Sequence, residues 1–149
     1  MKKALFFISI LCLSASCVST KSSIKNIDDN APTPRLINST TFLLSEYSKD
    51  KKYGYDKDYP INVFFMSTRN DTINQERFLN ALAGPNGEMI SYAKVESCCP
   101  FPTKRSEMGA GFLDVYEIRW AGQKNTIKLY MNCYEKGALL VPVGLTIKK

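Results

Sequence analysis

The chain has no histidine among its 149 residues. This absence excludes Ser-His-Asp and Cys-His catalysis, because both depend on an imidazole as general base. It also removes the most common partner of cysteine in zinc sites. Acid–base chemistry would then depend on carboxylates or lysines. Asp114 and Glu117 lie three residues apart on an expected strand, so they point to opposite faces and do not form a carboxylate pair.

No long apolar run follows residue 17, so a membrane-spanning helix is not expected beyond that point. The N-terminus itself has a basic start at Lys2 and Lys3 and an apolar core at 4–13, which is typical of a secretory signal. Small residues then lead directly to Cys17. The pattern resembles a bacterial lipoprotein signal peptide over 1–16, with Cys17 as the lipidated N-terminus. An ordinary cleaved signal peptide with an incidental cysteine is the alternative.

Lipidation at Cys17 would make the membrane the first partner of this protein. Two or more acyl chains hold a protein stably on a bilayer, since each buried methylene contributes roughly 0.8 kcal/mol. We therefore expect a lipid-anchored protein of the bacterial cell envelope, on the periplasmic face of the outer membrane. An envelope glycan or protein is the expected second partner.

The positive charge of the chain is mild. The formal charge is +6, of which Lys2 and Lys3 supply two. The remaining basic residues are scattered, and the two local clusters at 49–52 and 104–105 are typical of solvated loops. A nucleic acid is therefore not expected as a partner, and no motif indicates a cofactor or a metal.

The mature chain is expected to be one domain preceded by a tether. Residues 17–34 are polar and lack apolar periodicity, which predicts a flexible tether, and residues 35–149 have the length of a single domain. Thr72 and Gln75 form a capping-box pattern that begins a helix of about three turns, with Leu82 on its apolar stripe. Gly84 and the following proline would end it.

The rest of the domain predicts strands. Two stretches with alternating apolar residues, 112–120 and 126–134, are joined by a short loop containing glycine, which predicts a hairpin. Pro100 is expected to end an earlier strand just after the cysteines, and Pro142 belongs at an edge or a bulge. The fold class is therefore α+β, an antiparallel sheet of about five or six strands with one short helix packed on one face. The expected strand segments are 36–44, 61–66, 88–95, 112–120, 126–134 and 138–147.

The cysteines leave several arrangements open. If Cys17 is lipidated, Cys98, Cys99 and Cys133 remain, which is an odd number for an oxidising compartment. A bridge from one of the adjacent pair to Cys133 is plausible if their strands are neighbours. All three thiols could instead be reduced, or Cys98 and Cys99 could bond directly to each other as a reactive redox site. Three thiols are too few for a closed zinc site.

The tyrosines around Gly54 are the one suggestive binding feature. Tyr53, Tyr55 and Tyr59 could offer flat amphipathic faces to a glycan or a peptide, or could instead cap the core beneath a loop. The Gly-Ala-Gly run at 109–111 is not a nucleotide fingerprint, because it precedes a strand and lacks the third glycine.

The chain combines a set of distinctive motifs: YGY at 53–55, YPI at 59–61, ERFLNAL at 76–82, GPNGE at 84–88, SY at 91–92, SCCPF at 97–101, GFLDVYE at 111–117 and LYMN at 129–132. Together these motifs resemble a family of small Bacteroidetes lipoproteins of unassigned function. Members often carry the automatic label 2-dehydro-3-deoxyphosphooctonate aldolase. That chemistry belongs to a barrel of about 200 residues or more with alternating strands and helices, so the label is not taken as chemistry and no catalytic residues are carried over.

The sequence therefore predicts a small envelope lipoprotein that acts as a binding or envelope-assembly module. Its lipid signal and its lack of a recognisable catalytic constellation favour this reading. A small envelope enzyme that uses carboxylates or thiols is the alternative.

Overall fold

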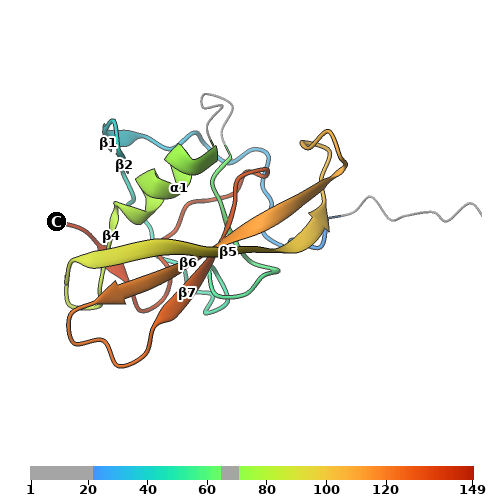
Figure 1. Cartoon of the computed structure of the whole chain (residues 1–149). Coiled ribbons are helices and arrows are strands. Elements are labelled where there is room, and N and C mark those ends of the chain that lie inside the picture. Colours follow the sequence, from blue (N-terminus) through green and yellow to red (C-terminus); the bar gives the residue numbers. More distant parts are fainter. Residues whose placement is uncertain (1–21, 65–70) are drawn as a thin grey trace, which may run out of the picture.

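The computed structural model describes residues 22–64 and 71–149. Within these residues the chain is mostly sheet with one short helix, so the α+β class is confirmed (Figure 1). The proposed signal peptide and Cys17 lie outside the described residues. In chain order the elements are β1 (Leu36–Asn38), β2 (Thr41–Phe42), β3 (Ile61–Asn62), α1 (Asp71–Leu79), β4 (Leu82–Ala83), β5 (Ile90–Pro102), β6 (Ala110–Trp120), β7 (Ile127–Asn132) and β8 (Thr146–Ile147).

The strands of the described residues divide into three sheets. The largest has the order β3-β7-β6-β5, with β5, β6 and β7 antiparallel and β3 parallel to β7. The other two are the pairs β1-β2 and β4-β8. A single antiparallel sheet of five or six strands is therefore not confirmed. The segment at 36–44 forms the short strands β1 and β2, which pair with each other, and the segment at 138–147 forms only β8, which pairs with β4. β3 lies parallel to its neighbour β7.

The β6-β7 hairpin is confirmed. Tyr116 lies opposite Leu129 and Ile118 opposite Ile127, so the apolar residues of both strands share one face. The expected end of the preceding strand at Pro100 is wrong. β5 continues through the cysteines to Pro102 because β6 pairs with it on both sides of an irregularity at that point.

The helix is shorter than predicted. α1 ends at Leu79, and Leu82 belongs to β4. The backbone around Leu82 pairs with the C-terminal strand instead of continuing the helix: Leu82 lies opposite Ile147, and the Lys148 amide donates to the Ala81 carbonyl at 2.9 Å. A long-range strand pairing has replaced the last turn that the apolar stripe predicted.

α1 lies over one face of the largest sheet (Figure 1). Its Phe78 and Leu79 are fully buried, and its Gln75 reaches β6, where it accepts a hydrogen bond from the Tyr116 hydroxyl at 2.8 Å. A nine-residue helix is marginal by itself, so these contacts hold it. The main core includes Phe42, Leu44, Tyr53, Ile61, Val63, Phe78, Leu79, Leu82, Tyr116, Ile118, Leu129, Met131, Val141 and Leu145.

The described part of the predicted tether, residues 22–34, packs on the domain. Ile24 is 6% exposed and belongs to a second apolar cluster with Phe101 and Leu113. The Lys25 amide donates to the Asp58 carbonyl at 2.8 Å. The isolated apolar residues in this polar stretch were too few to reveal a periodicity, but they are sufficient to fix the segment. Contacts with the domain therefore begin well before residue 35.

Candidate functional site beside a vicinal disulfide

Cys98 and Cys99 are bonded to each other, and Cys133 is a buried thiol outside any disulfide. The order of the strands explains why Cys133 does not form a disulfide with Cys98 or Cys99. β6 lies between β5, which carries Cys98 and Cys99, and β7, which ends just before Cys133. Two strand spacings of about 4.8 Å separate β5 from β7, whereas disulfides join α-carbons at most about 7 Å apart. The structure thus contains the direct pair among the arrangements that the sequence left open.

The disulfide lies in a bulge of β5. Cys98 lies opposite Leu113 and Phe101 lies opposite Gly111, so two residues of β5 face a single residue of β6. Cys99 has a φ of 58°, and among the described non-glycine residues it alone has a positive φ. This left-handed conformation costs an L-residue roughly 1–2 kcal/mol. Pro100 has no amide to pair, which is tolerated because β5 is an edge strand.

A bond between neighbouring cysteines links no distant segments. Disulfides stabilise proteins mainly by closing long loops in the unfolded chain, and the effect grows with the length of the loop. Cys98 and Cys99 are one position apart and close essentially no loop. The effect of this disulfide is therefore local: it holds the backbone of Cys99 in its bulged conformation.

The bulge places Phe101 directly over Gly111. The Phe101 ring meets the Tyr134 ring edge to face, with centroids 6.0 Å apart. A β-carbon at Gly111 would lie 2.7 Å from the Tyr134 ring and 3.0 Å from the Phe101 ring. Only glycine therefore fits beneath these two aromatic rings.

Gly111→Ala should lower the free energy of unfolding by about 2–3 kcal/mol, because both rings must shift to admit the methyl group. Chemical denaturation measures the loss. Gly122→Ala is the control: its β-carbon meets no atom within 4 Å, but its φ is 79°, so only a backbone cost of about 1 kcal/mol is expected. Equal losses for the two variants would contradict the close packing at Gly111.

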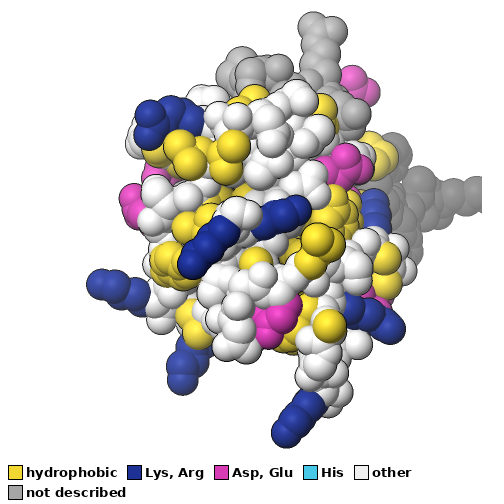
Figure 2. Space-filling model, turned by 90° about the vertical axis from the view of Figure 1, so that its left-hand side faces the viewer, with side chains coloured by type: hydrophobic (Ala, Val, Ile, Leu, Met, Phe, Trp, Pro, Cys, Tyr) yellow, Lys and Arg dark blue, Asp and Glu magenta, His cyan; other side chains and the backbone are white. Residues whose placement is uncertain are grey.

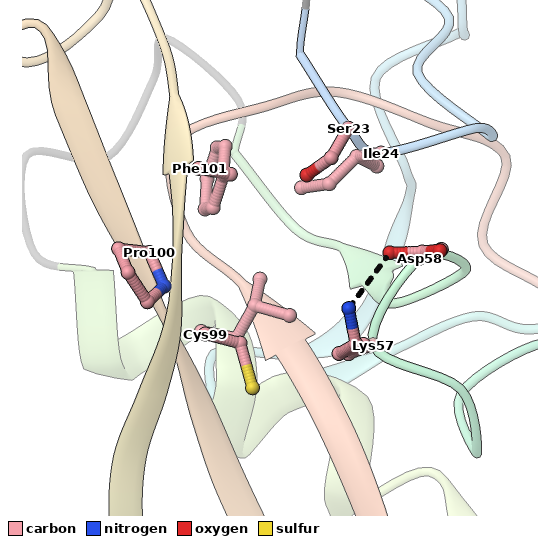
Figure 3. Close-up of a pocket in the computed structure, with 8 residues that line it drawn as sticks. Ser23, Ile24, Lys57, Asp58, Cys99, Pro100 and Phe101 are labelled. Atoms are coloured by element: carbon pink, nitrogen blue, oxygen red, sulfur yellow. Dashed lines mark ion pairs between the residues drawn. The ribbon is translucent and has the colours of Figure 1, made fainter.

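A cavity of about 280 Å³ adjoins the disulfide (Figure 3). Four segments meet around it: the N-terminal segment, the loop before β3, the bulge of β5, and β6. The lining residues are Ser23, Ile24, Lys57, Asp58, Cys99, Pro100, Phe101 and Leu113.

The wall of this cavity is apolar and its rim is charged. Pro100 and Phe101 lie on one side, and Lys57 and Asp58 face them across the opening (Figure 3). Ile24 lies next to Ser23, above Asp58 in this view. The Lys57 ammonium lies 3.5 Å from the Asp58 carboxylate, and the two side chains are 62% and 38% exposed. An exposed ion pair contributes little to stability, so its charged groups are available to hydrogen-bond a polar molecule at the rim.

Of the three tyrosines that could form a binding surface or cap the core, Tyr53 is buried and Tyr55 and Tyr59 are partly buried. Tyr53 is buried, which raises the pKa of its phenol, and its hydroxyl donates to the Ala138 carbonyl at 3.0 Å. The Tyr55 hydroxyl donates to the Val143 carbonyl at 2.8 Å. Tyr59 lies beneath the ammonium of Lys52, 5.5 Å from the ring centroid. Tyr53 and Tyr55 thus join their loop to the segment before β8, and the cavity lies beside that loop.

Asp114 is the carboxylate with the most polar partners on the face of the sheet that α1 covers. It accepts hydrogen bonds from Ser97 at 2.7 Å and Gln75 at 2.9 Å, and the Lys94 ammonium lies 2.7 Å away. Burial by itself would raise the pKa of Asp114, but the hydrogen bonds from Lys94, Ser97 and Gln75 together lower it below the ordinary value of 3.8. Asp114 therefore stays ionised at neutral pH and cannot act as a general acid.

Acidification should therefore remove part of the stability. Because the folded-state pKa of Asp114 lies below the unfolded value, its contribution is fully present above about pH 4 and is lost as the pH falls through the folded pKa. Urea unfolding at pH 7 and at pH 3 should show a smaller stability difference for Asp114→Asn than for the parent chain. An unchanged difference would contradict the ionised, hydrogen-bonded carboxylate.

A second carboxylate cluster was not predicted from the sequence. Glu135 is buried, accepts a hydrogen bond from Thr103 at 2.5 Å and pairs with the Arg105 guanidinium. Arg105 also pairs with Asp29 at 2.7 Å. These residues come from three separate parts of the chain, so no local sequence pattern predicts that they form a cluster. They fix the loop after β5 to the N-terminal segment.

No group of three or more cysteine or carboxylate side chains in residues 22–64 and 71–149 is arranged to hold a metal ion. No helix in the described part of the chain has the length and apolar character needed to cross a membrane. On the face shown in Figure 2, Lys and Arg side chains are spread among hydrophobic and uncharged ones, so that face has no basic stripe of the kind that follows a nucleic acid backbone.

No family model, curated protein or solved structure matches this chain. The interpretation of the site therefore depends on the geometry and chemistry of its own residues.

Proposed function

We propose that this chain is a lipid-anchored protein of the bacterial cell envelope whose domain binds a small ligand in the cavity beside Cys98 and Cys99. The cavity itself supports this proposal most strongly, because four separate segments converge on it and combine an apolar wall with a charged rim. Ligand sites in proteins typically have this composition. The signal pattern that ends at Cys17 supports the anchor, on the periplasmic face of the outer membrane.

The anchor and the fold together would hold the domain close to the membrane. Since the segment from residue 22 onward packs on the domain, only residues 17–21 would separate the lipid from it. Five residues reach at most about 17 Å when fully extended. The ligand should therefore be one that is available at the membrane surface.

A single sugar ring of an envelope glycan matches the cavity best. The volume of about 280 Å³ is just below the range of pockets for drug-sized ligands, so one ring-sized unit fits. The apolar face of a sugar could lie against Pro100 and Phe101, while its hydroxyls could reach the charged groups of Lys57 and Asp58.

Thermal unfolding with envelope saccharides tests the binding. A matching saccharide at a hundred times its dissociation constant should stabilise the domain by about 2.7 kcal/mol, which raises Tm by several degrees. Lys57→Ala should weaken the response, and Lys124→Ala, an exposed lysine on the β6-β7 loop, should leave it intact. No shift with any glycan or peptide of the envelope would contradict the proposal.

Metabolic labelling tests the anchor separately. Palmitate should appear on the full chain in bacterial cells and should be lost in Cys17→Ser. Cys12→Ser is the matched control, because Cys12 follows bulky residues and should leave the label unchanged. Label that persists in Cys17→Ser, or that never appears, would contradict lipidation at Cys17.

A further inference from the structure

The N-terminal segment packs partly on the β5 bulge that contains Cys98 and Cys99. Ile24 packs with Phe101 and Leu113, and Cys99 packs against this cluster. The neighbouring Lys25 amide donates to the carbonyl of Asp58, and Asp58 lines the same cavity as Cys99. The conformation of Cys99 therefore bears directly on the packing of residues 22–25.

The next part of the segment also packs on this cluster, through Ile27, but it has hydrogen bonds outside the cluster as well. The Asn26 side chain donates to the Pro60 carbonyl at 2.7 Å, and the Asp28 amide donates to the Lys136 carbonyl at 2.8 Å. These contacts involve neither cysteine. A change at the disulfide should consequently loosen residues 22–25 and leave the hydrogen bonds of Asn26 and Asp28 in place.

The disulfide is placed where a reductant can reach it. Both cysteines are partly exposed, and the Cys99 side chain lines the cavity beside Lys57 (Figure 3). Cys133 is buried, so it is a poor competitor for the same reagent.

We propose that Cys98 and Cys99 form a reversible redox site, opened by a dithiol reductant, whose opening releases residues 22–25 from the domain. This role does not depend on the saccharide ligand. A thiolate of the reductant attacks one sulfur of the pair, which gives a mixed disulfide and a protein thiolate. The second thiol of the reductant then attacks the mixed disulfide. Two electrons and two protons pass to Cys98 and Cys99, and the reductant leaves as a disulfide.

Opening the bond removes the covalent constraint that holds Cys99 in its left-handed conformation. The backbone of Cys99 can then return to extended geometry, in which the bulge is lost. Losing a bulge shifts the strand register by one position and reverses the faces of the residues beyond it. Phe101 would leave its position over Gly111, and Ile24 would lose its contact with Phe101.

Amide exchange of the full chain tests this coupling. Dithiothreitol under native conditions should generate two thiols, identified at Cys98 and Cys99 by alkylation and peptide mass, and the exchange of the Lys25 amide should become about tenfold faster. The Asp28 amide is the internal control and should be unchanged. A disulfide that resists dithiothreitol until the domain unfolds, or a Lys25 amide that exchanges equally in both states, would overturn the proposal.

Two variants complete the test. Cys98→Ser combined with Cys99→Ser should show fast exchange at Lys25 without any reductant, whereas Cys133→Ser should respond to dithiothreitol as the parent chain does. A double variant with slow Lys25 exchange would contradict the role of the disulfide. If the double variant fails to fold, the exchange of the Lys25 amide in the reduced parent chain still tests the proposal. Saccharide binding by the oxidised chain is measured independently, so failure of the ligand proposal and failure of this one are distinguishable.

Discussion

Phe78→Ala is expected to lower the free energy of unfolding by about 4 kcal/mol. Phe78 is 0% exposed and is among the largest fully buried side chains of the described residues. Its removal leaves a cavity at the point where α1 meets the core, and a helix of nine residues has little stability without its packing. Urea unfolding followed by circular dichroism measures the loss.

Ile73→Ala on the same helix is the matched control. Ile73 is only partly buried, so its truncation should cost about 1 kcal/mol. Similar losses of stability for the two variants would mean that Phe78 is not the main contact between α1 and the core.

Asn62→Leu is expected to cost about 3 kcal/mol, and its effect comes from hydrogen bonds. Asn62 and Asn132 are both essentially unexposed, and the Asn132 amide donates to the Asn62 side-chain oxygen at 2.9 Å. The Asn62 amide donates in turn to the Asn26 carbonyl at 2.9 Å. Leucine would leave a buried donor and a carbonyl without their partners, and each such loss costs about 1–3 kcal/mol.

The Asn62 result can be separated from a general effect of the new apolar side chain. Asn125→Leu, at an exposed loop position, should change stability by less than about 0.5 kcal/mol. Asn62→Leu should also speed exchange of the Asp28 amide, because Asn62 helps to hold the N-terminal segment through Asn26. A neutral Asn62→Leu variant would contradict the buried amide pair.

The sequence predicted best those elements whose conformation depends on residues that are close together in the chain. The alternation in 112–120 and 126–134 correctly predicted the β6-β7 hairpin, because cross-strand neighbours with one buried face repeat every two residues. The capping box placed the start of α1 within two residues of its first residue, Asp71. Its end was missed, because Leu82 fits a helical stripe equally well and only pairing with the distant β8 decides its conformation.

The site was less predictable because distant segments build it. No pattern in residues 22–25 reveals that Ile24 meets Phe101, since one apolar residue has no periodicity. The pairing of the cysteines depends on the strand order, which places β6 between Cys98 and Cys133. The adjacent cysteines followed by Pro100 were the one local sign of an irregular strand, and their meaning required the register of β5 on β6.

Disulfide mapping of the native chain tests the basis of the site most directly. The chain would be alkylated without reduction, digested and analysed by mass spectrometry. A direct disulfide predicts one peptide that contains both Cys98 and Cys99, unalkylated and two hydrogen atoms lighter than its dithiol form, together with an alkylated Cys133 once the chain is denatured. A cross-linked peptide that contains Cys133, or alkyl groups on both Cys98 and Cys99, would contradict it.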